Sequence, residues 1–198
     1  MIGASLLWVG WFGFNAGSAV AANALAGAAM ANTQIATAAA ALAWMVVEWV
    51  HRKKPTMLGL ASGAVAGLVA VTPASGFVNP TGALVVGIAA GIGCYAGAVW
   101  LKNAFKYDDS LDAFGVHGIG GFIGALLTGV FADATINPAG KVHSILTQFY
   151  GCLGTIVWSA VFTFLILMVC KFTTGLRVTD QAEMEGLDLA LHGEAIHD

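Results

Sequence analysis

A histidine in an apolar, glycine-rich stretch is the residue best suited to chemistry in this sequence. His117 lies in the run Phe114-Gly-Val-His-Gly-Ile-Gly-Gly121. An imidazole titrates near neutral pH and its two nitrogens can donate and accept in turn, so it can relay a proton. Ionisable groups inside apolar segments are expensive and usually face a cavity or the interior of a helix bundle. His117 is therefore a candidate functional residue, against the alternative of a structural histidine bonded to a neighbouring helix.

A second candidate is a stripe of four residues near the N-terminus. Helical spacing of i, i+4, i+7 and i+11 places them on one face, and they are Leu7, Trp11, Phe14 and Ser18. A hydroxyl and an indole face can attract a small cation by hydrogen bonding and cation–π attraction. The phenyl ring beneath them would close the path to water and ions. An aromatic packing stripe would have the same spacing, and the sequence leaves both interpretations open.

Signatures of catalysis are missing from the sequence. It contains no G-x-S-x-G, Walker A or H-E-x-x-H motif, and Glu48 and Asp112 do not form a carboxylate pair. The three cysteines lie in apolar stretches without metal-ligand spacing. The sequence therefore predicts a protein that is not an enzyme and that uses no cofactor and no metal.

The composition predicts a protein that lives in lipid. Of the 198 residues, 58% are apolar and only 10% are charged, whereas soluble domains carry about 25% charged residues. The mean hydropathy is +0.81. These values exclude a disordered chain and an ordinary soluble enzyme, and the net charge of −3 offers no basic surface to a nucleic acid. A polytopic, all-α bundle of transmembrane helices is expected.

Long uncharged stretches predict six spans. The stretch from 2 to 50 is too long for one crossing of about 20 residues, and we expect its break at Ala29–Gln34, where polar side chains cluster. The stretch from 55 to 101 should break at Thr72–Thr81, which is rich in turn residues. The expected spans are 2–28, 35–50, 55–71, 82–101, 111–132 and 145–170.

The charges predict the orientation. Seven of the eight basic residues fall on the side of the C-terminal tail, and only Lys141 falls on the other. The positive-inside rule then makes the tail cytoplasmic. We expect a membrane domain over 1–172 and an acidic tail over 173–198, which is either a solvated end or a segment that docks on the basic loops.

Glycine spacing predicts tight helix packing. Pairs four residues apart, including Gly13 with Gly17 and Gly120 with Gly124, place small residues on one helix face and let backbones approach closely. Counting from Ser110 at about 1.5 Å per residue, His117 should lie about 10 Å into its helix. Ala113, Gly120 and Gly124 should share its face and leave room around the ring.

Three separated motifs resemble the Amt/Mep/Rh ammonium transporter family, and the match is closest to bacterial Amt members. The motifs are Gly10-Trp-Phe-Gly-Phe-Asn-Ala-Gly-Ser18, Phe114-Gly-Val-His-Gly118, and the tail run Thr174-Gly-Leu-Arg-Val178 with Glu185-Gly-Leu-Asp188 and His192-Gly-Glu194. The resemblance implies a fold of eleven helices, built as two inverted five-helix repeats and a last long helix, in trimers with one pore per subunit. The six helices look like the sixth to eleventh, so Met1 is expected at a truncation point and this portion alone is not expected to transport.

The resemblance also implies roles for the candidate residues. Trp11 and Ser18 match an outer ammonium site, Phe14 a gate ring, His117 one of two pore histidines and Leu7 a pore-lining residue. Ala113 stands where some relatives have a larger side chain, so the pore could be locally wider.

The implied function is ammonium or ammonia transport through an apolar pore in the plasma membrane. A PII-type signalling protein is implied as a partner at the cytoplasmic face. The alternative is a membrane ammonium sensor that signals through its tail. A sensor would be expected to carry an appended signalling domain, and the sequence ends at Asp198 without one.

Overall fold

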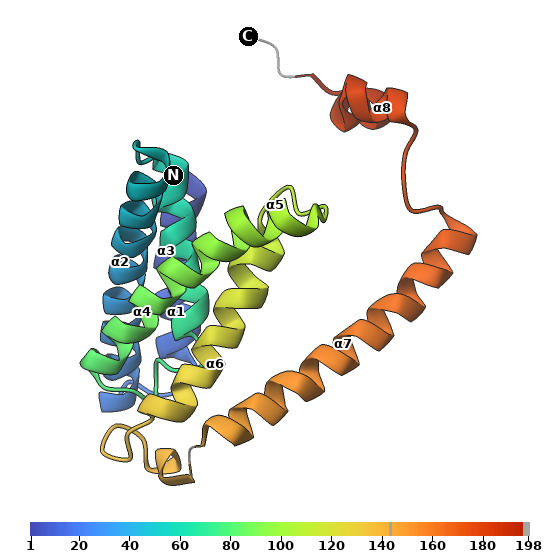
Figure 1. The fold of residues 1–198 in the computed structure, drawn as a ribbon. Helices are drawn as coiled ribbons and strands as arrows, with labels where there is room; N and C mark the ends of the chain where they lie inside the picture. Colours follow the sequence, from blue (N-terminus) through green and yellow to red (C-terminus); the bar gives the residue numbers. More distant parts are fainter. Residues whose placement is uncertain (143, 196–198) are drawn as a thin grey trace. The chain divides into compact units, whose positions relative to one another are not determined.

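A bundle of helices makes up most of the structure, a computed structural model that describes residues 1–142 and 144–195 (Figure 1). The chain divides into two compact units, residues 1–152 and 153–198. The elements are α1 (Ile2–Gly17), α2 (Ala24–Arg52), α3 (Met57–Val71), α4 (Pro80–Tyr95), η1 (Ala96–Leu101), α5 (Lys102–Phe105), η2 (Phe114–Gly118), α6 (Ile119–Phe131), η3 (Pro138–Val142), α7 (Ile145–Thr173), α8 (Asp180–Glu185) and η4 (Asp188–His192).

Small residues bring the helices of the first unit together. Helix α2 packs along both α3 and α4, α6 packs against α3 and α4, and α1 lies against α2 and α3 (Figure 1). A Cβ added at Gly67 of α3 would come within 2.7 Å of the Ala36 carbonyl oxygen of α2. The predicted packing role is wrong for Gly13 and Gly17, because nothing among the described residues lies within 4 Å of either position.

The first helix break is not where the polar cluster predicted it. Positions 29–34 lie inside α2, and the chain turns at 18–23 instead. Asn32 is buried and its Nδ2 donates to the carbonyl oxygens of Ser75 and Val78, at 2.9 and 2.6 Å. Asn23 begins α2 as its N-cap by accepting from the Ala26 N–H at 3.0 Å. The polar cluster therefore joins helices rather than ending one.

The second break lies where the sequence predicted it. Helix α3 ends at Val71 and α4 begins at Pro80. Asn79 accepts a hydrogen bond from the Gly82 N–H at 2.9 Å, and Pro80 occupies the first turn, where its missing N–H costs nothing. The segment between these helices therefore forms a compact turn, and the hydrogen bonds from Asn32 fix it to α2.

Two π-helical segments meet across the bundle. Segment η1 continues α4, and η2 begins the helix that carries His117. The two touch through small residues: a Cβ added at Gly115 would come within 2.8 Å of the Ala98 Cα. Single π-turns occur frequently at functional sites, and here one of them includes the candidate histidine.

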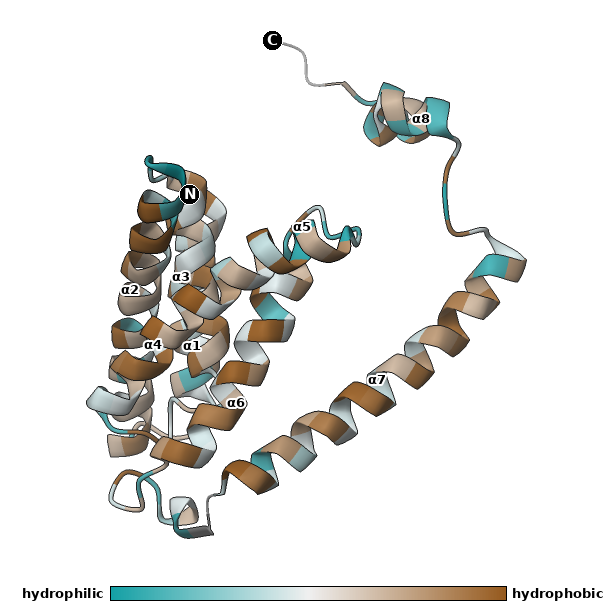
Figure 2. Ribbon diagram, in the orientation of Figure 1, coloured by the Kyte–Doolittle hydropathy of each residue, from teal (hydrophilic) through white to brown (hydrophobic). Residues whose placement is uncertain are grey.

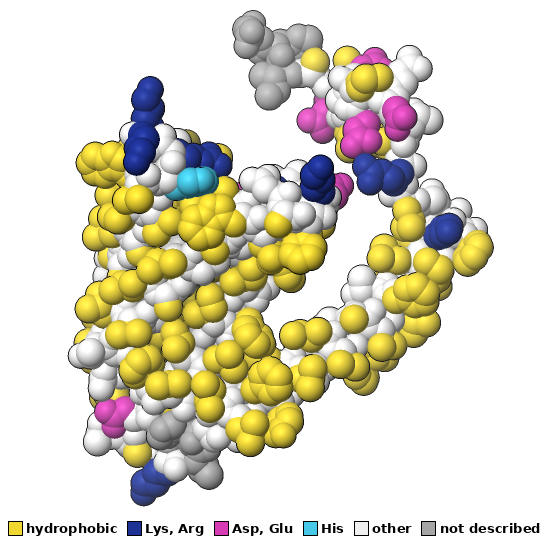
Figure 3. Space-filling model, in the orientation of Figure 1, with side chains coloured by type: hydrophobic (Ala, Val, Ile, Leu, Met, Phe, Trp, Pro, Cys, Tyr) yellow, Lys and Arg dark blue, Asp and Glu magenta, His cyan; other side chains and the backbone are white. Residues whose placement is uncertain are grey.

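The predicted class, a transmembrane helix bundle, is confirmed. Among residues 1–142 and 144–195, four helical runs are long and apolar enough to cross a membrane: Ala24–Arg52, Pro80–Phe105, Phe114–Phe131 and Ile145–Thr173. Helices α1 and α3 are shorter, at 16 and 15 residues. Hydrophobic residues predominate along α7 (Figure 2). Apolar side chains also cover the visible side of the first unit, while most of its Lys and Arg side chains gather at one end (Figure 3).

Candidate functional site

Three cavities follow one another along the open face of α1. The Ser18 cavity, of about 220 Å³, includes Ser18 and Phe14 in its wall. The Trp11 cavity, of about 590 Å³, includes Phe14, Trp11 and Leu7. The His117 cavity, of about 170 Å³, includes Leu7 and His117. Among the described residues, the Trp11 cavity is an open groove lined by α1 alone. It shares Phe14 with the first cavity and Leu7 with the third, so the predicted stripe is continuous with the histidine.

Apolar side chains line the junctions between neighbouring cavities. Phe14 is 62% exposed and Leu7 is 49% exposed. The Phe14 ring meets the Trp11 ring edge-on, with centroids 6.1 Å apart. These side chains offer a charged species no counter-charge, and burying a charge without one is costly. This part of the face is suited to an uncharged molecule.

Ser18 presents an oxygen rather than a proton to its cavity. Its Oγ–H donates to the Phe14 carbonyl oxygen at 2.6 Å, one helical turn back. A hydroxyl that donates in this way keeps lone pairs free to accept. Ser18 is therefore arranged to accept hydrogen bonds from a ligand that carries N–H groups.

Trp11 uses its only hydrogen-bond donor inside the protein. The indole Nε1–H donates to Thr72 Oγ1, at the C-terminal end of α3, at 2.7 Å. The ring is half-buried and packs against the core cluster that contains Trp44 and Tyr95. The indole can therefore offer a cavity only its π surface, which attracts cations. Trp11 therefore packs against the core and also lines a cavity.

His117 lies nearer to its helix start than the sequence predicted. It is the fourth residue of η2 rather than about 10 Å into a helix that began near Ser110. The residues from Ser110 that were expected to begin the helix belong instead to a loop. In this loop Asp109 Oδ2 accepts from the backbone N–H groups of Phe114 and Gly115, at 3.0 and 3.2 Å. Lys102 Nζ in turn donates to Asp112 Oδ1 at 2.6 Å.

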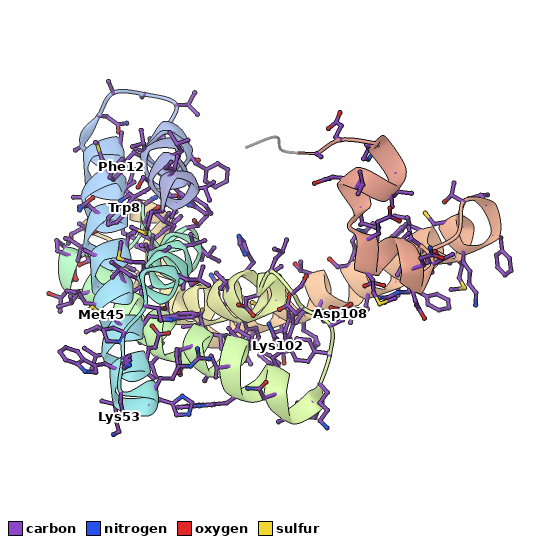
Figure 4. The ribbon with its side chains drawn as sticks, turned by 90° about the horizontal axis from the view of Figure 1, so that it is seen from above. Trp8, Phe12, Met45, Lys53, Lys102 and Asp108 are labelled. Atoms are coloured by element: carbon purple, nitrogen blue, oxygen red, sulfur yellow. The ribbon has the colours of Figure 1, made fainter. Side chains whose placement is uncertain are left out.

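Figure 4 labels Lys102 and also Asp108, which lies in the loop before η2. It also labels Trp8 and Phe12, which lie where α1 and α2 meet. These two side chains of α1 therefore belong to the helix contact, on a different side from the cavities.

The expectation that small residues share the face of His117 is wrong. Gly120 and Gly124 are buried against α3, and a Cβ at Gly124 would collide with the Ala70 carbonyl. Ala113 and His117 are exposed, and Ala113 lies outside the residues that line the His117 cavity. The π-turn between them explains the difference, because its wider turn breaks the α-helical spacing used for the prediction.

Sequence reasoning missed several polar residues of the cavity walls. Thr72, Ser75 and Asn137 line the Ser18 cavity, and Ser62 lines the His117 cavity. A polar side chain inside an apolar helix was the available signal for Ser62. No such signal existed for Asn137, because it lies in a loop and reaches the cavity only through the tertiary fold.

Asp133 lies in the loop between α6 and η3, which also contributes Asn137 to the wall of the Ser18 cavity. Hydrogen bonds from Thr135, first from its hydroxyl and then from its backbone N–H, hold the pKa of Asp133 below its usual value, and Asn79 adds to this. Within the described residues, no three His, Cys, Asp or Glu side chains gather in a way that could hold a metal ion.

Comparison with known sequences finds one family along almost the whole chain. The model of the Ammonium Transporter Family matches residues 1–196. The chain is 50% identical to "Ammonium transporter" of Aquifex aeolicus, over 98% of this chain and 47% of the relative. It is 46% identical to "Ammonium transporter" of Bacillus subtilis, over 98% of this chain and 50% of the relative. The chain thus spans about half the length of these curated relatives.

Solved structures also share the fold of this chain. Saccharomyces cerevisiae Mep2 matches with a TM-score of 0.83 and 35% identity, over 90% of this chain and 43% of that one. A structure titled "Sensor Amt Protein" matches with a TM-score of 0.88 and 32% identity, over 96% of this chain and 48% of that one.

Proposed function

This chain belongs to the ammonium transporter family, and from that premise we propose that the open face of α1 is one wall of a path for ammonium or ammonia. The continuous row of cavities from Ser18 to His117 is the observation that supports the proposal most directly. The path begins with groups that attract a cation, continues past apolar side chains and reaches a residue that can hold a proton.

Capture takes place at the Ser18 end. Ammonium carries a positive charge and four N–H donors, so it is recognised by acceptor oxygens and by π surfaces. Ser18 offers a hydroxyl oxygen whose own proton is already used, and Trp11 offers a ring face whose N–H is already used. Directional hydrogen bonds and cation–π attraction can then distinguish ammonium from potassium, which has a similar size and charge but no hydrogen to donate.

Passage beyond Phe14 favours the neutral form. The Trp11 cavity is lined by Gly3, Leu6, Leu7, Gly10, Trp11 and Phe14, which offer no charged group. Ammonium that gives up its proton to bulk water at the Ser18 end, before this section, avoids the cost of a poorly solvated charge. His117, beyond Leu7, carries two ring nitrogens that can donate and accept a proton in turn.

Assembly and topology follow the family resemblance. The proposed functional unit is a homotrimer in the plasma membrane, with the tail in the cytoplasm and the cavities completed by the half of the relatives that this chain does not match. The basic residues gathered at one end of the first unit support that orientation (Figure 3). The acidic helix α8 supports a role for the tail in contacts with a PII-type protein or with basic loops.

A sensor is the second candidate function, and the likeness to a sensor Amt structure favours keeping it. The two functions share the capture site and differ in the step after capture. A transporter must pass substrate beyond Phe14, whereas a sensor needs only a change at its tail.

Uptake by cells without ammonium transporters of their own tests transport. The chain is expressed by itself and, separately, fused behind the half of the Aquifex aeolicus relative that it does not match. We expect labelled methylammonium uptake from the fusion and none from the isolated chain, because Leu7 and Phe14 are exposed along an open face. A fusion that reaches the membrane, binds ammonium and shows no uptake would contradict transport and favour the sensor.

A further inference from the structure

Two side chains of α1 reach across to two different helices in the same way. Trp11 Nε1 donates to Thr72 Oγ1 of the turn after α3 at 2.7 Å, and Asn15 Nδ2 donates to Thr33 Oγ1 of α2 at 2.9 Å. Trp11 and Asn15 are four residues apart, so they lie about 40° apart around the axis of α1. Both donors therefore lie on one side of the helix and point into the bundle.

Both threonine hydroxyls are fixed as acceptors by their own backbones. Thr72 Oγ1 donates its proton to the Leu68 carbonyl oxygen at 2.7 Å, and Thr33 Oγ1 donates to the Ala29 carbonyl oxygen at 2.7 Å. In each case the bond runs one helical turn back, so the hydroxyl proton is already used. Each oxygen can then only accept, which matches the Trp11 and Asn15 donors.

Trp8 and Phe12 pack where α1 meets α2, and apart from this packing few contacts in the described residues fix the rotation of α1. The glycines Gly3, Gly10, Gly13 and Gly17 of this helix have nothing within 4 Å of a Cβ position, so it lacks the glycine contacts that hold α3 and α6. Asn15 is the one buried residue of α1. Lipid supplies no hydrophobic drive between helices, so directional contacts carry more weight there.

We propose that Thr72 and Thr33 are positioning residues that set the rotation of α1 and thereby aim the stripe of Leu7, Phe14 and Ser18 at the cavities. A rotation by one residue position is about 100°, which would turn Phe14 and Ser18 away from their present cavity. The Thr72 bond also holds the indole so that its ring face, and not its N–H, is available to a ligand. The consequence for ligand capture rests on the proposed function, whereas the setting of the helix does not.

Hydrogen exchange on the 198-residue chain in lipid nanodiscs tests the setting of the helix without transport. Thr72→Val and Thr33→Val keep the shape of the side chain and remove the acceptor, while Thr72→Ser and Thr33→Ser restore it. Thr128→Val is the matched control, because Thr128 is buried and its hydroxyl, among the described residues, donates within its own helix to the Gly124 carbonyl oxygen. We expect amide exchange in α1 to be at least about 10-fold faster in the double valine variant and near wild type in the serine variants.

Three outcomes of this experiment would overturn the proposal. The first is unchanged α1 exchange in the double valine variant, and the second is equal acceleration in Thr128→Val. The third is a double valine variant that loses protection in α2–α4 as fully as in α1, because the threonines would then support the whole bundle. Serine rescue confined to α1 would support it.

Uptake by the fusion protein tests the consequence for the site. Thr72→Val should raise the half-saturation concentration about 3- to 10-fold and leave the maximal rate within about twofold, with Thr72→Ser at the wild-type value. Trp11→Phe removes the N–H and keeps a ring, so Thr72→Val should add no further effect in that background. An equal effect in both backgrounds would refute action through the indole. Absence of uptake by an unmutated fusion that reaches the membrane and binds ammonium would refute transport and leave the exchange result to decide the helix setting.

Discussion

Replacing Ser18 by alanine should weaken the capture of ammonium more than it slows passage. The hydroxyl proton of Ser18 is used by the Phe14 carbonyl, so the change removes an acceptor that faces the cavity and leaves the backbone in place. Alanine is also a good helix former, and α1 should therefore persist. The change therefore removes only the hydrogen bond between the ligand and the Ser18 hydroxyl oxygen.

The size of the effect follows from the type of bond. A hydrogen bond to a charged group contributes about 1.5–3 kcal/mol. Since about 1.4 kcal/mol corresponds to a factor of ten in affinity, the half-saturation concentration should rise roughly 10- to 150-fold. Solvent at the exposed Ser18 position reduces the effect, so the lower end of this range is expected.

The assay is methylammonium uptake by the fusion protein, with ammonium as competitor over a concentration series. Ser5→Ala is the matched control, because Ser5 is an exposed serine of the same helix and lies outside the three cavity walls. Ser18→Thr, which keeps a hydroxyl, should retain most of the affinity. An unchanged half-saturation with a lower maximal rate in Ser18→Ala would refute the capture role and assign Ser18 to passage or packing.

Three further predictions concern the gate, the bundle and the loop. In the fusion protein, Phe14→Ala should allow a potassium leak, because it removes a steric block. His117→Ala should reduce uptake or selectivity, because it removes a proton acceptor. Uptake and leak at wild-type levels in both variants would contradict the proposed path. Asn32→Ala should lower the free energy of unfolding in detergent titrations by about 1–4 kcal/mol, since two interhelical hydrogen bonds are lost, whereas Gln34→Ala, at an exposed position, should not. The lowered pKa of Asp133 means that its ionised form stabilises the folded loop above the ordinary carboxyl pKa of 3.8. This stabilisation should disappear as the pH falls from that value through the lower pKa of the folded state; Asp133→Asn should abolish this pH dependence of loop hydrogen exchange, and an unchanged dependence would contradict it.

Apolar run length and turn residues were enough to predict most of the fold. The turn before Pro80 was predictable because Asn79 and Pro80 carry local signals for a helix start. The predicted break at Ala29–Gln34 was wrong because Asn32 donates a hydrogen bond to the Ser75 carbonyl oxygen, 43 residues away in the sequence. A sequence shows that a side chain is polar but not which partner satisfies it.

The candidate site shows the same division between local and tertiary information. Helical spacing correctly gathered Leu7, Phe14 and Ser18 along one row of cavities. It failed around His117, because a π-turn changes the spacing without a recognisable residue signature. It could not anticipate Thr72 as the partner of Trp11, because that contact joins residues 61 positions apart.

The π-turn at η2 also bears on how relatives of different length should be compared. A π-turn accommodates one residue more than an α-turn over the same rise, so loss of a single residue between Asp112 and Ile119 could be absorbed by conversion to an ordinary α-turn. Helix α6 and its glycine contacts with α3 would keep their register, while the histidine would change its direction. An alignment gap in this short interval therefore signals a re-aimed imidazole, even where every flanking residue is identical.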